Sequence, residues 1–152
     1  MGIQKGDKCP SFSLKDQNGE TVNIEDIIGQ QNIVIYFYPK DDSPGCTKQA
    51  CSFRDSFEDF KDAGAKVIGI SSDNQKSHKK FAEKHNLPFT LLADSQKKVR
   101  KLFGVPTNLL GLIPGRVTYI VDKSGTVQGV FNSQMNFDKH TTEALKILKE
   151  LK

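Results

Sequence analysis

The chain of 152 residues is 36% apolar and 26% charged, which excludes a disordered chain and fits one compact domain over residues 1–152. Its net charge of +4 comes from lysines interspersed with acidic residues, so solvated helix faces are favoured over a nucleic-acid site. With no apolar run near the roughly 20 residues that span a bilayer and no signal-peptide core, we expect a cytoplasmic protein without membrane contact, or a plastid one if a transit peptide precedes this sequence.

Predicted strands and helices alternate along the chain. The N-terminal stretch predicts a small accessory hairpin, because Phe12 and Leu14 precede an Asp-Gln-Asn-Gly turn and residues 21–24 follow it. Residues 32–38 form a continuous apolar, β-rich run, which is typical of a strand buried on both faces. Further strands are expected at 66–70, 116–121 and 127–131, the last two as an antiparallel hairpin, and helices at 47–63, 75–85, 96–103 and 138–151. This order predicts an α/β fold with helices flanking a mixed central sheet.

Three cysteines, Cys9, Cys46 and Cys51, are too few for a disulfide scaffold, and their odd number leaves at least one unpaired. Cys46 and Cys51 are too far apart for Cys-x-x-Cys redox spacing. Without a second cysteine pair or a nearby histidine pair they do not complete a zinc site, so we expect no metal. Cys9 has no partner in the sequence and is expected to be an incidental free thiol.

The segment 38–51 gives Cys46 a position that suits a reactive thiol. A buried strand ends at Tyr38, a proline-rich loop follows, and a helix begins near Cys46. The sulfur is thereby expected at the carboxyl end of a central strand, where open α/β sheets keep their ligand sites. Free backbone N–H groups and the positive end of the helix dipole favour a thiolate there. Position alone also allows a buried cysteine that only fills space.

The two cysteines of this helix face different surroundings. Ala50 and three phenylalanines recur after Cys46 at helical spacing, so Cys46 heads the apolar face. Cys51 lies about 7.5 Å further along the axis and about 140° around it. That rotation places it on the polar face, near Arg54, Asp55 and Glu58.

The run Tyr-Pro-Lys-Asp-Asp-Ser-Pro-Gly-Cys at 38–46 lies within a longer recognisable stretch. Residues 36–55 closely resemble the active-site segment of the peroxiredoxins, specifically the peroxiredoxin Q or bacterioferritin comigratory protein subfamily. The resemblance extends through residues 12–16, 69–71, 87–92 and 115–119. The stretch 104–119, followed by Phe131, Asn132 and His140, looks most like the plant and cyanobacterial type. The resemblance implies a thioredoxin-like fold.

The same resemblance implies that Pro39, Ser43, Cys46 and Arg116 build the active site. Pro39 would shield the thiolate from water, and the Ser43 hydroxyl would hydrogen-bond both the peroxide and the sulfur. Arg116 would stabilise the thiolate and the charge that develops on the leaving oxygen. The family usually has Thr where this chain has Ser43, so the hydroxyl is kept but a methyl that restrains its rotamer is lost.

The implied activity is a thioredoxin-dependent peroxidase cycle. Cys46 would attack hydrogen peroxide or an organic hydroperoxide and become a sulfenic acid, Cys51 would condense with it to an intramolecular disulfide, and thioredoxin or a similar dithiol would reduce that disulfide. No cofactor is implied, and members of the subfamily are often monomers. Because a disulfide needs Cα atoms within about 7 Å and converging Cβ vectors, the first helical turns must unwind before Cys46 and Cys51 can join.

Three other functions remain open from the sequence. A general thiol-disulfide oxidoreductase would carry its second cysteine at position 49, which is Gln49 here. A cysteine hydrolase would need a histidine base, but His78, His85 and His140 lie in or beside polar helical segments and are expected on the surface. A redox sensor would use the same disulfide to change the shape of the helix and so the affinity of a partner.

Overall fold

A mixed sheet runs through the structure, a computed structural model that describes residues 2–108 and 113–151. Its strands are β1 (Ser13–Asp16), β2 (Thr21–Asn23), β3 (Asn32–Phe37), β4 (Ala65–Ser71), β5 (Thr90–Ala93), β8 (Val117–Val121) and β9 (Val127–Asn132). They lie in the order β2-β1-β5-β4-β3-β8-β9. The central strands β3, β4 and β5 are parallel, while the pairings toward both edges are antiparallel. A separate short ribbon pairs β6 (Thr107–Asn108) with β7 (Ile113–Pro114).

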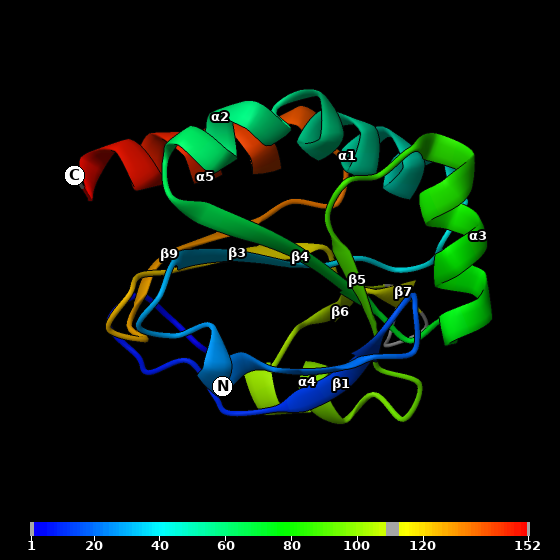
Figure 1. Cartoon of the computed structure of the whole chain (residues 1–152), viewed down its shortest axis with the longest axis horizontal. Coiled ribbons are helices and arrows are strands. Elements are labelled where there is room, and N and C mark those ends of the chain that lie inside the picture. The colour runs from blue at the N-terminus through cyan, green and yellow to red at the C-terminus, as the bar shows by residue number, and fades with distance from the viewer. Residues whose placement is uncertain (1, 109–112, 152) are drawn as a thin grey trace.

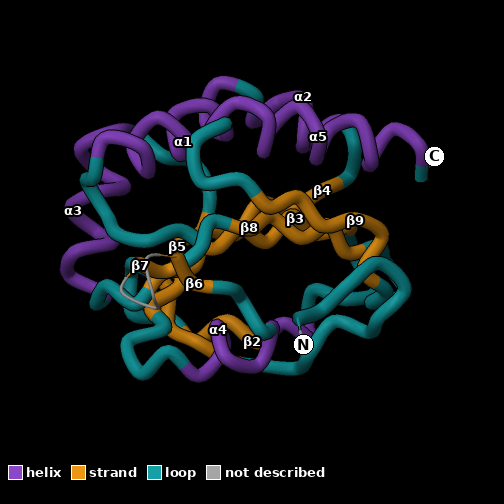
Figure 2. Tube along the Cα trace, turned by 180° about the vertical axis from the view of Figure 1, so that it is seen from behind, coloured by secondary structure: helices purple, strands orange, loops and turns teal. Residues whose placement is uncertain are grey.

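Helices cover the sheet unequally. They are η1 (Ile24–Asp26), α1 (Pro44–Asp55), α2 (Phe57–Asp62), α3 (Gln75–His85), α4 (Lys98–Phe103) and α5 (Phe137–Glu150). Figures 1 and 2 show α1, α2 and α5 together over one face, with α4 and the N-terminal segment under the other. Helix α3 packs beside β5 and β1. In the described part of the chain, no helix is both long enough and apolar enough to cross a membrane.

Strand β3 supplies side chains to both layers of the core. Val34 and Tyr36 lie in the cluster under α1, α2 and α5, whereas Ile33, Ile35 and Phe37 lie in the cluster on the opposite face. All five are at most 1% exposed. This alternation follows from the two-residue period of a strand, and it explains why both sets must be apolar. The predicted α/β fold with a mixed central sheet is confirmed.

The accessory hairpin forms as predicted but is part of the main sheet. β1 pairs with β2 around the expected turn, and β1 also pairs with β5 through Lys15 with Ala93 and Asp16 with Leu92. Strand β5 was not among the predicted strands, because four residues are too short for a period to stand out. The antiparallel hairpin of β8 and β9 is confirmed, as is the helix at 75–85.

The prediction of one continuous helix at 47–63 is wrong, because the structure has two helices and the first begins earlier. The helical segment begins at Pro44 and divides into α1 and α2 at Ser56, whose φ of −103° and ψ of 13° leave the helical region. Serine and aspartate form helices weakly, since their side chains compete for backbone hydrogen bonds, and Asp55 precedes the break. Phe53 before the break and Phe60 after it are both fully buried and belong to one cluster.

Helix α4 likewise begins at Lys98 rather than at residue 96. Lys97 has a φ of +58°, which ends any earlier helical turn. The Asp94 carboxylate then accepts hydrogen bonds from the backbone nitrogens of Val99 and Arg100, so it serves the start of the helix as a cap. Part of the stretch 104–119 that carries the family resemblance, residues 109–112, lies outside the described residues.

Two histidines expected on the surface are buried. His78 and His140 are 0% exposed, and each ring is hydrogen-bonded through both nitrogens. Their helices are polar on one side only, and each histidine lies on the other side. The expectation of a surface position was therefore wrong for both residues.

Burial, with the nearby charge of Arg116 adding to it, lowers the pKa of His140 from 6.5 to about 4. The unfolded chain binds this proton near pH 6.5, but the folded protein binds it only near pH 4. The free energy of unfolding should therefore decrease as the pH falls through this window, by on the order of 3 kcal/mol.

Urea unfolding of the native chain and of His140→Gln at several pH values measures this effect. We expect the variant to lose less stability than the native chain on going from pH 6.5 to pH 4. The same pH dependence in both proteins would show that His140 is not the group responsible.

Candidate active site

The loop after β3 delivers Cys46 to the first turn of α1. Ser43 is the N-cap with an extended φ and ψ of −72° and 151°, and Pro44 occupies the first turn, where its missing N–H costs nothing. The Thr47 backbone nitrogen donates to the Ser43 carbonyl at 2.9 Å and closes that turn. Cys46 is 1% exposed and belongs to the apolar cluster that includes Ala50. The helix N-terminus therefore directs its positive end at a sheltered sulfur.

The Ser43 side chain makes no capping hydrogen bond to the helix. Its hydroxyl does not cap the helix but donates to the Lys40 carbonyl at 3.0 Å. A hydroxyl that donates in this way keeps its oxygen lone pairs for an incoming donor. Pro39 is half-buried at the start of the same loop. Both residues thus lie on the segment that leads into Cys46.

Arg116 reaches the same helical turn from the start of β8. It is 4% exposed, and its guanidinium lies 4.8 Å from the centroid of the Phe137 ring. Its Nε donates to the Gln134 carbonyl at 3.1 Å. A Cβ atom on Gly45 would lie 2.7 Å from the Phe137 ring and 3.1 Å from Arg116 Nη2, so glycine before Cys46 leaves room for this ring and the guanidinium beside the first turn of α1.

Gln49 holds Arg116 from the helix side. Arg116 Nη1 donates to Gln49 Oε1 at 2.6 Å, a short bond to a charged donor, and Gln49 is 0% exposed. Its Nε2 has no hydrogen-bond partner among the described residues. Gln49 was considered from the sequence only as a position that lacks a second cysteine. A polar residue three positions after Cys46, on the buried face of the helix, was the available signal for its role.

A buried tyrosine hydroxyl lies beneath α1. Tyr36 stacks on Phe53 with ring centroids 4.5 Å apart, and its hydroxyl has no partner among the described residues. Burial above all, followed by the neighbouring Cys46 and Asp41, raises the pKa of Tyr36 well above its usual value. The hydroxyl therefore keeps its proton in the folded protein.

Cys51 lies on the outer side of the same helix. It is half-buried and lines a groove between α1 and the start of α5, with Lys48, Ser52, Asp55 and residues 135–139. Its expected place near Asp55 is thus confirmed, although the groove also includes Met135, which is 73% exposed. Both Cys46 and Cys51 are free thiols here, with α1 intact between them.

Cys9 lies far from this site in the sequence and has different surroundings. Its sulfur is buried against the core and contacts the Pro10 carbonyl at 3.5 Å. Burial, and to a smaller extent the charge of Glu25, raises its pKa to about 12. A thiol with that pKa stays protonated at neutral pH and is a poor nucleophile.

Comparison with known proteins identifies the family. The sequence pattern of the AhpC/TSA family matches residues 5–130. The chain belongs to the AhpC/TSA family.

Its relatives within the AhpC/TSA family include the chloroplastic peroxiredoxin Q of Arabidopsis thaliana, to which it is 56% identical over 147 residues, covering 97% of this chain and 68% of that protein. The peroxidoxin BcpB of Mycobacterium tuberculosis has a TM-score of 0.92 and 35% identity, with 99% of both chains covered. The bacterioferritin comigratory protein of Xanthomonas campestris has a TM-score of 0.84 and 29% identity over 92% of this chain and 91% of that one. The resemblance to peroxiredoxin Q and the thioredoxin-like fold are thereby confirmed.

Gln49 offers a direct test of this arrangement. Gln49→Met keeps the buried volume but removes the oxygen that accepts from Arg116, so we expect the second-order rate of peroxide consumption to fall about tenfold. Gln49→Glu keeps an acceptor and should stay closer to the native rate. Stopped-flow kinetics measures both, and a Gln49→Met variant as fast as the native chain would contradict the role given to Gln49.

Proposed function

We propose that Cys46 is the peroxidatic cysteine of this chain and that Cys51 resolves it. The chain is a thiol-dependent peroxidase, an oxidoreductase, as its family and relatives indicate. The observation that supports this choice of cysteine is the approach of the Arg116 guanidinium to the first turn of α1, the turn that holds Cys46. Neither Cys9 nor Cys51 lies at a helix N-terminus.

The first step is a two-electron oxidation of Cys46. Its thiolate attacks the terminal oxygen of a hydroperoxide, a sulfur–oxygen bond forms, and the oxygen–oxygen bond breaks. The leaving alkoxide or hydroxide takes up a proton, and the product is a sulfenic acid. Arg116 stabilises the charge that moves onto the leaving oxygen, Ser43 hydrogen-bonds the peroxide, and Pro39 limits access of water.

The second step joins two sulfurs that α1 keeps apart. The Cys51 sulfur attacks the Cys46 sulfenic acid, a disulfide forms, and water leaves. On an intact helix the rotation of about 140° between the two residues prevents this bond. Helix α1 must therefore unwind locally, and it gives up the bond from Arg54 Nη1 to the His85 carbonyl at 2.8 Å and the contact of Ser52 with Thr141 at 2.7 Å.

The substrate is a peroxide and the reductant a thiol protein of the thioredoxin kind. We infer hydrogen peroxide and organic hydroperoxides as substrates, since work on the similar Xanthomonas protein concerns alkyl peroxide reduction. The chloroplastic names of the relatives favour the plastid over the cytoplasm. We further propose one domain over residues 1–152 that acts as a monomer, without nucleic acid, membrane or cofactor.

Two cysteine variants test the assignment. Cys46→Ser should abolish peroxide consumption, because the nucleophile is lost. With one equivalent of peroxide, Cys51→Ser should stop at the sulfenic acid, which a sulfenate-specific probe detects. Further equivalents should only overoxidise Cys46 to sulfinic and sulfonic acids, which mass spectrometry detects. Peroxide consumption by Cys46→Ser at the native rate would refute the assignment.

The same assay separates an enzyme from a redox sensor. With catalytic amounts of thioredoxin and its reductase and an excess of NADPH, we expect the native chain to turn over many equivalents of peroxide. One equivalent followed by arrest in the native chain would instead favour the sensor.

A further inference from the structure

We propose that Asp41 and His78 are positioning residues for the peroxide reaction, because their buried pair fixes the loop that carries Pro39 and Ser43. The inference rests on the proposed function, since it assigns a role to residues that do not touch the reacting atoms. It concerns two residues that the mechanism above does not use.

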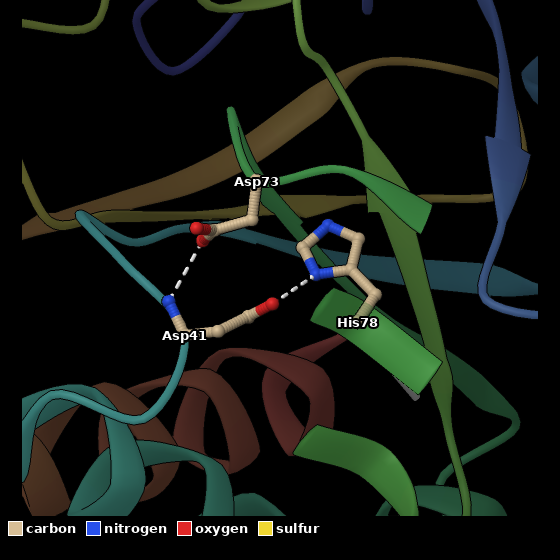
Figure 3. Close-up of side chains that lie close together, drawn as sticks. All are labelled: Asp41, Asp73 and His78. Atoms are coloured by element: carbon tan, nitrogen blue, oxygen red, sulfur yellow. Dashed lines mark hydrogen bonds and ion pairs between the residues drawn. The ribbon is translucent and has the colours of Figure 1, made fainter. Parts of the chain in front are cut away.

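Asp41 is the centre of a buried hydrogen-bond network (Figure 3). Its carboxylate accepts from the Tyr38 hydroxyl at 2.6 Å and from the Ser77 hydroxyl at 2.7 Å, and it lies 2.7 Å from His78 Nδ1. Asp41 is only 5% exposed, and the His78 side chain is fully buried. The backbone nitrogen of Asp41 donates to the Asp73 carboxylate at 2.7 Å. Both its side chain and its backbone are therefore held.

Hydrogen-bond geometry defines how the pair shares its protons. His78 Nε2 lies 2.9 Å from the Leu92 carbonyl, which can only accept, so Nε2 donates to β5. One proton then lies between Nδ1 and the Asp41 carboxylate, whichever of the two atoms carries it. Replacing either residue by an apolar one leaves a buried polar group without its partner. The pair links the loop after β3 to α3 and to β5.

The network acts on the loop that leads into Cys46. Asp41 lies between Pro39 and Ser43, two residues from each, so the Asp41 backbone cannot shift without moving both. The next residue, Asp42, has a φ of +64°, and its carboxylate accepts from Lys84 Nζ at 3.1 Å. Two consecutive loop residues are therefore tied to α3, one inside the protein and one on its surface.

The hydrogen bonds of Asp41 form a tether that can hold the loop in place while α1 unwinds. The resolving step needs residues after Ser43 to leave the helix, and the peroxide step needs them back in place with Pro39 and Ser43 unmoved. None of the contacts of Asp41 described above involves α1. The tether can therefore persist while the helix unwinds and guide the segment as it refolds.

A metal ion is the alternative occupant of this cluster. Ligand atoms of Asp41, Asp73 and His78 lie within 4.8 Å of one another. Donors from Tyr38 and Ser77 already occupy the Asp41 oxygens, and the Ser71 hydroxyl donates to Asp73 at 2.7 Å. The oxygens are thus supplied with protons, and a cation would have to displace them.

Single-turnover oxidation in a Cys51→Ser background tests the proposal, because it isolates the first step from resolution. Asp41→Asn and His78→Leu should each lower the rate constant of Cys46 oxidation about tenfold or more at temperatures well below their melting points. His78→Asn keeps a donor near the place of Nδ1 and should recover most of that loss. If the two residues only stabilised the fold, the variants would lower the amplitude of the reaction, which reports the fraction of folded protein. The rate constant would then be unchanged.

Asp122→Asn is the matched control. Asp122 also organises a turn through its carboxylate, which accepts from Ser124, Thr126 and Gln128, but it lies at the opposite end of β8 from Arg116. We expect its rate constant to match the parent. The proposal would be overturned if Asp41→Asn and His78→Leu reacted with the same rate constant as Asp122→Asn. It would also be overturned if the rate of the Cys51→Ser parent depended on added Zn²⁺ or were lost with EDTA. Failure of the proposed function is distinct, since the Cys51→Ser parent itself would then not react with peroxide.

Discussion

Helix α1 has to meet two demands that exclude each other. Folded, its first turn surrounds Cys46 with backbone N–H groups and brings it near the Arg116 guanidinium. The same regular helix points Cys51 away into the groove beside α5. The proposed cycle of Cys46 and Cys51 therefore requires a helix stable enough to hold the thiol form and weak enough to unwind in every turnover.

Helix α1 is short and has few polar bonds to its neighbours, whereas the strand beneath it is firmly held. The helix ends at Ser56 after twelve residues, so unwinding need not spread into α2. Its buried side contributes Cys46, Ala50 and Phe53 to the core, whereas the bonds of Ser52 and Arg54 to α5 and α3 are few and partly exposed. Beneath it, β3 is paired with a strand on each side and is buried from Ile33 to Phe37, which gives the reacting residues a firm base.

Much of this site could be predicted from local sequence, and the rest depends on contacts between distant segments. The apolar stripe after Cys46 correctly predicted its burial and the outward position of Cys51. Gln49 and His78 were missed, because their importance lies in Arg116, 67 positions away, and in Asp41, 37 positions away. Neither residue stands out from its neighbours in the sequence. His78, for example, lies in a polar helix with many lysines, which resembles any solvated helix face.

Amide hydrogen exchange of the native chain in its reduced and its disulfide forms tests the central claim most directly. We expect the hydrogen-bonded amides of residues 47–55 in α1 to lose most of their protection in the disulfide form, while those of β3 and α3 keep theirs. A disulfide between Cys46 and Cys51 that forms with α1 still protected would contradict the account.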